Sequence, residues 1–254
     1  MPRSSGWWHS ATGYNPSAMC AAELRPELRI ELGAEGAGYA VWTPADRTLG
    51  VAFVGCGSTE PRADILAAIS NTNRSVAFLR QVHGSDCLDG RPGCVGEGDA
   101  LTTDSRDIAL AISTADCVPV VLLTPGRATA VHAGWRGIVA GVVHQAVESF
   151  SGNSDPIIAW IGPAIGRCCY EVGHEVAQSV LEACGDRRCL EERVAPSRPH
   201  LDLSRAVESQ LRSCGVECVE RVSVCTRCDS RLHSFRRDGA ASGRNLTFAW
   251  LPAS

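Results

Sequence analysis

The sequence predicts a single α/β or α+β domain in which helices cover the faces of β-sheets. Short apolar runs rich in β-branched residues recur along the chain, and segments with helical spacing lie between them. The 254 residues are 44% hydrophobic and 20% charged, which is ordinary usage for a globular protein. Disordered, collagen-like and coiled-coil chains are therefore excluded.

Six apolar runs are predicted to be strands, because they are too short for typical helices. Several of them are apolar at nearly every position, so we expect these strands to be buried on both faces. The runs are residues 108–112, 118–123, 129–131, 157–161, 219–224 and 246–251.

Three segments have helical spacing. They are residues 138–150, 172–184 and 204–214. Val139, Val142, Val143 and Ala146 form the apolar stripe expected on the first helix. Gly185 is expected to end the second, and Asp202 or Ser204 to cap the third.

Composition predicts one domain over residues 26–254, preceded by a loose arm, residues 1–25, rich in Ser, Gly, Pro and Asn. No apolar stretch is long enough for a membrane helix, and the first residues lack the apolar core of a secretory signal. We therefore expect a cytoplasmic protein with mostly reduced thiols and no membrane partner. The net charge of -4, with both signs interspersed, argues against a nucleic-acid partner.

Several enzyme classes are excluded by missing residues. The chain has no lysine, so it contains neither a P-loop nor a lysine Schiff base. It also lacks a Gly-x-Ser-x-Gly elbow, a Gly-x-Gly-x-x-Gly after a strand and a His-Glu-x-x-His pair.

Three polar side chains follow or end predicted strands beside small residues: His83, Cys117 and His132. Zinc takes Cys sulfur and His nitrogen tetrahedrally, and a catalytic zinc keeps three protein ligands and one open position. A site of this kind is one interpretation. The alternative is that each His is an ordinary structural residue and that the Cys packs in the core.

The order of several motifs is more specific. They are QVHG at 81–84, GDALTT at 98–103, TADCVP at 114–119, HAGWRG at 132–137, IGPAIG at 161–166, CYEVG at 169–173, CT at 225–226, SFRRD at 234–238 and SGR at 242–244. Together they resemble the bacterial laccase-domain family, described both as multicopper polyphenol oxidases and as purine nucleoside phosphorylases. The resemblance runs from about Phe78 to Leu251 and weakens before His83.

The resemblance implies that His83, Cys117 and His132 are zinc ligands. It implies a layered sandwich of mixed β-sheets flanked by helices. It also implies that the small-molecule partners are a purine nucleoside and phosphate. The implied reactions are phosphorolysis of adenosine, inosine, guanosine and methylthioadenosine, with adenosine deamination as a side activity.

Further candidates lie inside the matched motifs. Arg136, Arg236 and Arg244 are candidates for phosphate binding, because a guanidinium grips phosphate oxygens well. Asp116 and Glu171 are candidates for proton transfer in catalysis. Asp116 could instead orient neighbouring loops or ligands, and Glu171 could be a charge favoured near a helix N-terminus.

Three other functions stay open. A copper-dependent polyphenol oxidase is one, although 7 histidines without a His-x-His pair cannot build a multicopper cluster. A single copper in place of zinc is compatible with two His and one Cys. A Cys/His hydrolase using Cys117 and His132, and a non-enzymatic metal-binding protein, are the others.

The remaining cysteines give a weaker signal. Cys225 and Cys228 form a Cys-x-x-Cys, with Cys214 and Cys218 upstream, which could be a second zinc site. Packing or an incidental thiol pair is the favoured interpretation. The adjacent pair at 168–169 is expected to be structural.

Overall fold

The computed structural model describes residues 25–32, 38–44, 49–55, 62–70, 73–192 and 198–252. Two large mixed sheets dominate these residues. The seven-stranded sheet has the order β1 (Pro26–Leu32), β2 (Gly38–Pro44), β3 (Val51–Val54), β15 (Asn245–Trp250), β8 (Ile108–Thr114), β4 (Ser75–Arg80) and β6 (Gly93–Glu97). The six-stranded sheet has the order β14 (Cys218–Arg221), β11 (Ile158–Ile161), β9 (Val118–Leu123), β10 (Ala128–Ala133), β7 (Ala100–Thr103) and β5 (Cys87–Asp89).

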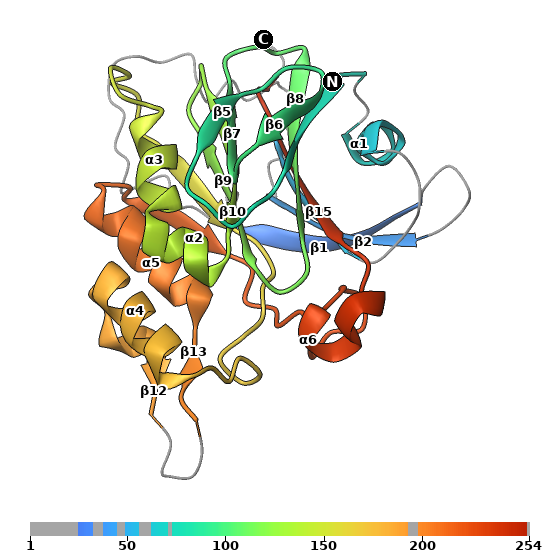
Figure 1. Cartoon of the computed structure of the whole chain (residues 1–254). Helices are drawn as coiled ribbons and strands as arrows, with labels where there is room; N and C mark the ends of the chain where they lie inside the picture. The colour runs from blue at the N-terminus through green and yellow to red at the C-terminus, as the bar shows by residue number, and fades with distance from the viewer. Residues whose placement is uncertain are drawn as a thin grey trace.

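The helices lie outside the two sheets (Figure 1). They are α1 (Arg62–Ser70), α2 (Trp135–Ala140), α3 (Val142–Glu148), α4 (His174–Cys184), α5 (Leu203–Ser213) and α6 (Phe235–Asp238). Short elements complete the fold: the pair β12 (Leu190–Glu191) and β13 (His200–Leu201), and the single 3-10 turns Arg187–Cys189 and Gly239–Ala241.

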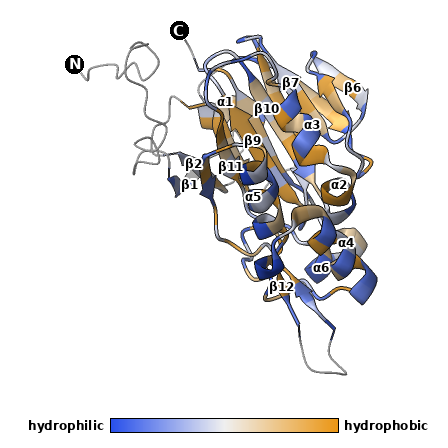
Figure 2. Ribbon diagram, turned by 90° about the vertical axis from the view of Figure 1, so that its left-hand side faces the viewer, coloured by the Kyte–Doolittle hydropathy of each residue, from blue (hydrophilic) through white to orange (hydrophobic). Residues whose placement is uncertain are grey.

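Three apolar clusters define four layers. One cluster lies between the six-stranded sheet and helices α2 to α5, a second lies between the two sheets, and a third lies between the seven-stranded sheet and α1. Apolar residues accordingly concentrate on the sheet strands in Figure 2. This confirms the predicted sandwich of mixed sheets flanked by helices.

The inner strands of the six-stranded sheet, β11, β9, β10 and β7, are buried on both faces, as predicted for apolar runs, whereas the edge strands β14 and β5 are only partly buried. In β11, Ala159 and Ile161 join the helix-side cluster, while Ile158 and Trp160 join the cluster between the sheets. Strand β9 alternates in the same way. Because successive side chains point to opposite faces, both faces need apolar residues, and the alternating pattern of a half-exposed strand is absent.

The helix predictions need corrections. The helix expected over 138–150 is two helices, α2 and α3, separated by Gly141 at a φ of +88°, a left-handed conformation that glycine tolerates. The predicted stripe is buried at Val142, Val143 and Ala146, whereas the Val139 side chain is 41% exposed and lies outside the core. The Asp202 cap is confirmed, since its side chain accepts a hydrogen bond from the Arg205 backbone N–H.

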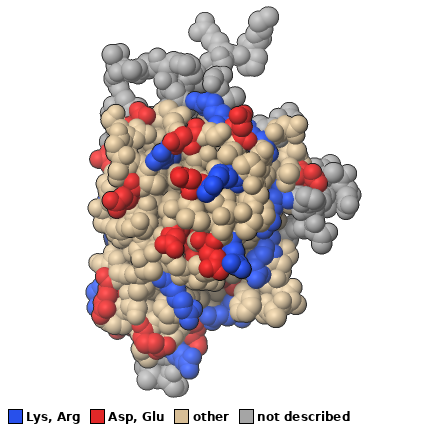
Figure 3. Space-filling view, turned by 45° about the horizontal axis from the view of Figure 1, so that its top comes forward, with Lys and Arg blue, Asp and Glu red and all other residues tan. Residues whose placement is uncertain are grey.

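The predicted N-terminal arm, residues 1–25, lies outside the described residues except for Arg25. No helix of the described part of the chain is long and apolar enough to cross a membrane. On the face drawn in Figure 3, arginines and acidic side chains are interspersed.

The layered core predicts a stability difference between two Phe→Ala substitutions. Phe248 on β15 is fully buried, whereas Phe235 on α6 is 56% exposed. Phe248→Ala should lower the free energy of unfolding by about 3–5 kcal/mol, because it removes packed apolar atoms and leaves a cavity. The matched control, Phe235→Ala, should change it by less than about 0.5 kcal/mol. Urea unfolding measures both, and equal losses would contradict this packing.

Candidate functional site

Three connections carry the chain from the seven-stranded sheet to the six-stranded sheet, and each brings one polar side chain to the same place. The connections are residues 81–86, 98–99 and 115–117. They hold His83, Asp99 and Cys117 beside His132, which lies on β10. The site is therefore built where the chain crosses between sheets.

His83, Cys117 and His132 lie close enough to share one metal ion. Their potential ligand atoms all lie within 4.8 Å of one another. The Cys117 Sγ is 3.9 Å from the His83 Nε2, and the two imidazole rings meet edge to face at 4.8 Å between centroids. His132 is buried, Cys117 is half-buried and His83 is exposed, so the group is open to solvent on the His83 side.

Gly134 leaves the space that this group occupies. A Cβ at this position would lie 2.9 Å from His83 Cδ2 and 3.1 Å from Cys117 Sγ. Any larger residue would push these two side chains apart. The motif glycine is therefore explained by the close approach of the His83 and Cys117 side chains.

Asp99 orients the group, a role that the sequence analysis did not assign although its motif contained the residue. Its buried carboxylate lies 2.7 Å from His132 Nδ1. It also accepts hydrogen bonds from the backbone N–H groups of Val82, His83 and Gly84, at 3.2, 3.0 and 2.6 Å. Holding Nδ1 in this way leaves the other ring nitrogen of His132 available for a metal, a common arrangement for His ligands.

The protonation states fit metal ligation. Burial opposes ionisation of Cys117, but hydrogen bonding to His132 and His83 outweighs it and lowers the pKa of the thiol to about 6. Burial likewise opposes protonation of His132, yet the neighbouring Asp99 and Cys117 raise its pKa to about 9. The site thus favours a thiolate beside a positive charge. A metal cation can replace the imidazolium proton there.

Backbone strain gathers at the same place. Among the described residues, His83 and Asp116 are the non-glycine residues with positive φ, at +62° and +88°. Such conformations cost free energy and persist where the surrounding structure imposes them, which is common at functional sites.

Asp116 has hydrogen-bond partners at both carboxylate oxygens. Oδ1 accepts from the Thr226 hydroxyl at 2.5 Å, and Oδ2 accepts from the Arg236 backbone N–H at 2.6 Å. The carboxylate therefore joins the connection before β9 to the loop after β14 and to the first turn of α6. Glu171 is about half exposed, with its Oε2 4.0 Å from His200 Nε2, and its carbonyl accepts from Arg236.

Tyr170, which the sequence analysis gave no role, lies among the candidate residues. Burial raises the pKa of its hydroxyl to about 12, with smaller contributions from the charges of Cys117 and Asp116 that Arg236 and Arg136 oppose. The Arg236 guanidinium lies 5.3 Å from the Tyr170 ring centroid. Tyr170 therefore stays protonated and can donate a hydrogen bond at neutral pH.

The three candidate arginines are all exposed, and none forms an ion pair with another described residue. Arg136 stacks on Trp135 at 4.4 Å. The charges of Arg136 and Arg236 both lower the pKa of Tyr170. Arg244 instead donates hydrogen bonds to the carbonyls of residues 242–243 in its own loop. The charges of two of the three arginines therefore reach the Tyr170 hydroxyl, and Arg236 also lies over its ring.

The chain belongs to the family described as multi-copper polyphenol oxidoreductase laccase, whose model matches residues 59–252. Its relatives include a protein named purine nucleoside phosphorylase YfiH in Escherichia coli, 34% identical over 73% of this chain and 78% of that protein. A purine nucleoside phosphorylase of Streptomyces coelicolor is 40% identical over 69% of this chain and 75% of that protein.

Solved structures share the fold. YlmD of Geobacillus stearothermophilus matches with a TM-score of 0.69 and 26% identity, over 90% of this chain and 98% of that chain. A Neisseria meningitidis protein matches with a TM-score of 0.68 and 25% identity, over 89% of this chain and 99% of that one.

The multicopper description of the family fits these residues poorly. A multicopper centre needs several copper ions with separate ligands, mostly histidines. Within the described ranges, the potential metal-binding group that contains histidine is His83, Cys117 and His132. This donor set suits a single zinc or a single copper.

The lowered pKa of Cys117 predicts selective alkylation after metal removal. Because pH 7 lies above the thiol pKa of about 6, Cys117 is mostly thiolate, which is the reactive form. Cys87 is the control, because burial and the nearby Asp89 raise its pKa to about 11. Iodoacetamide at pH 7, followed by peptide mass spectrometry, should label Cys117 much faster than Cys87. Similar rates would contradict the electrostatics of the site.

Proposed function

We propose that this protein is a zinc-dependent purine nucleoside phosphorylase with adenosine deamination as a side activity. The observation that carries the proposal is the solvent-open group of two imidazoles and one thiolate, in a family whose relatives bear the phosphorylase name. Three protein ligands are typical of catalytic zinc, whereas structural zinc has four. The proposed partners are a purine nucleoside and phosphate, and the proposed location is the cytoplasm.

His83, Cys117 and His132 would hold the zinc, with Asp99 fixing the ring of His132. When bound, zinc would supply Lewis-acid chemistry to the reacting group next to it. Because the protein ligands leave one position open, we assign that position to substrate or water.

Phosphorolysis joins a phosphate oxygen to ribose C1′ while the bond from C1′ to the purine nitrogen breaks. The products are ribose 1-phosphate and the free base, which takes up a proton. Arg136 and Arg236 would bind the phosphate, because both are exposed and neither is in an ion pair with a described residue. The charges of both also lower the pKa of Tyr170. Arg244 would be an outer contact, since its guanidinium is held by its own loop.

Proton transfer is assigned to the carboxylates. Glu171 is about half exposed and follows Tyr170 directly, so we propose that its carboxylate exchanges protons with substrate. Asp116 would support catalysis by positioning Arg236, because its Oδ2 accepts a hydrogen bond from the Arg236 backbone N–H. Its Oδ1 is held by the Thr226 hydroxyl. The protonated Tyr170 would donate a hydrogen bond to the bound substrate.

The experiment combines metal content with adenosine turnover in the presence and absence of phosphate. We compare the wild type with His83→Ala and with a control, His144→Ala, whose side chain is exposed on α3. We expect phosphate-dependent release of adenine in the wild type and the control, and its loss together with the site's zinc in His83→Ala.

Other outcomes would replace the proposal. Inosine formation without phosphate would make deamination the main reaction. Copper with oxygen uptake on a phenol would support the polyphenol oxidase. Turnover of a metal-free protein through Cys117 would support the hydrolase, and stoichiometric metal without any turnover would support a binding protein.

The buried bond between Asp99 and His132 predicts a loss of metal affinity. Asp99→Asn keeps the shape of the side chain but removes the charge, so zinc affinity should fall about 10–100-fold. Asp86→Asn, on an exposed side chain in the 81–86 connection, should leave affinity unchanged. Competition with a chromophoric chelator measures both. An unchanged affinity in Asp99→Asn would mean that this carboxylate does not act on the ligand.

A further inference from the structure

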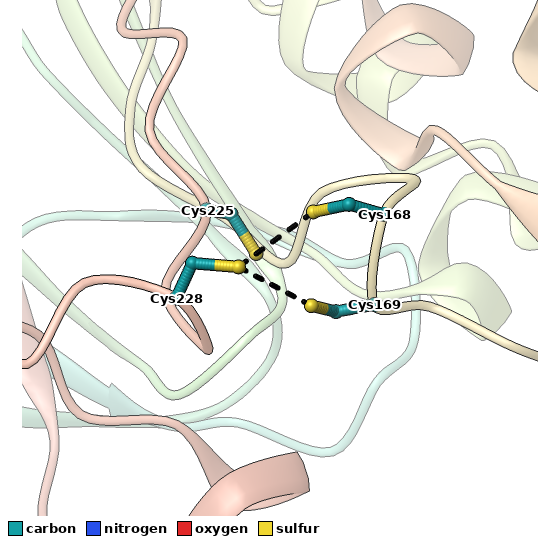
Figure 4. A group of neighbouring side chains, drawn as sticks. All are labelled: Cys168, Cys169, Cys225 and Cys228. Carbon is teal, nitrogen blue, oxygen red and sulfur yellow. Dashed lines mark hydrogen bonds between the residues drawn. The ribbon is translucent and has the colours of Figure 1, made fainter.

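Four cysteines from two loops that are distant in the sequence lie together at the surface. This group differs from the one that the sequence suggested, in which Cys214 and Cys218 accompany Cys225 and Cys228. Cys168 and Cys169 lie in the loop after β11, and Cys225 and Cys228 lie in the loop after β14 (Figure 4). All four Sγ atoms lie within 4.8 Å of one another. The upstream Cys214 and Cys218 do not belong to this group.

The spacing fits one metal ion at the centre. A Zn–S bond of about 2.3 Å places the four sulfurs of a tetrahedral site about 3.8 Å apart. The Cys228 Sγ is 3.8 Å from the Cys168 Sγ and 3.4 Å from the Cys169 Sγ. A cluster of several iron ions between the sulfurs would need wider spacing.

The backbone already holds the thiols in place. The N–H groups of Cys228 and Asp229 donate to the Cys225 carbonyl, which folds the Cys-x-x-Cys into a tight turn. The two loops are joined by a backbone bridge between Ala164 and Cys225. The Gly166 N–H donates to the Cys225 Sγ at 3.2 Å, as backbone amides do to thiolates.

Gly166 packs against the thiols, and arginines adjoin the cysteines in the sequence. A Cβ on Gly166 would lie 3.2 Å from the Cys225 Cβ and 3.3 Å from the Cys168 Sγ, so a side chain there would crowd the group. Four thiolates around a divalent cation carry a net charge of about −2. Arg167 and Arg227 adjoin the cysteines in sequence, and Arg237 donates to the carbonyls of Thr226 and Arg227.

We propose that Cys168, Cys169, Cys225 and Cys228 bind a structural zinc ion, separate from the His83–Cys117–His132 site. Binding exchanges the four thiol protons for Zn²⁺ and needs no oxidant. The Cys228 sulfur is close to two others at once, which one shared ion explains and one disulfide does not. Four protein ligands close the coordination sphere, so this ion has no place for substrate.

The ion would hold together the loops after β11 and β14, which carry Tyr170 and Thr226. Cys169 directly precedes Tyr170, and Cys225 directly precedes Thr226, which donates to Asp116. The linked cysteines are 59 and 60 residues apart in the chain. A bond across that distance removes freedom from the unfolded chain and from the two loops. The inference does not depend on the proposed reaction.

The test isolates this site in the full chain. The variant His83→Ala, Cys117→Ala lacks the first site, and after expression with zinc it should retain about one zinc per chain. X-ray absorption should show four sulfur neighbours at about 2.3 Å. Adding Cys225→Ser and Cys228→Ser should abolish this zinc and lower the melting temperature. Adding Cys94→Ser, at an exposed thiol on β6, should change neither.

The X-ray absorption measurement keeps all four cysteines, so it remains decisive if the serine variant does not fold. The proposal would be overturned if the protein held no zinc, or if it held iron instead. It would also be overturned if the metal had nitrogen or oxygen neighbours in place of sulfur, or if the four cysteines formed disulfides. None of these readouts uses enzymatic activity, so failure of the phosphorylase proposal is recognised separately.

Discussion

The arrangement of the site depends on one buried carboxylate. Asp99 is inaccessible to solvent, and a charge in that position must be compensated by hydrogen bonds. Burial alone would raise its pKa, but His132 and the backbone N–H groups of Gly84 and His83 lower it. The same bonds join the 81–86 connection, the 98–99 connection before β7 and the inner strand β10. Satisfying this charge therefore fixes two potential metal ligands relative to each other.

The two-sheet core makes that arrangement possible. Each connection that supplies a site residue crosses between stacked sheets, so its length and direction are set by the apolar contacts between the layers. His132 is held within β10, a strand whose six residues are all buried. The packed strands on both sides hold His83 and Asp116 at positive φ, because the contacts of the surrounding structure offset the local cost.

Sequence reasoning predicted the interior strands of the six-stranded sheet, because burial on both faces leaves unbroken apolar runs such as β9. It missed the break at Gly141, since a left-handed glycine within an apolar helical pattern gives no periodic signal. Ordered motifs marked His83 and His132, which the structure brings together. They gave no role to Asp99, because its bond to His132 spans 33 residues. The four-cysteine group was missed for the same reason, as local spacing pointed to other thiols.

The position of the His–Cys group between the two sheets links metal binding to the stability of the fold. Its potential ligand atoms come from two connections between the sheets and from β10, so an ion bound there would hold strands of both sheets together. Any ion that binds only the folded chain raises apparent stability as its free concentration rises. The resistance of this protein to heat or denaturant would then be a property of the protein and its metal supply together.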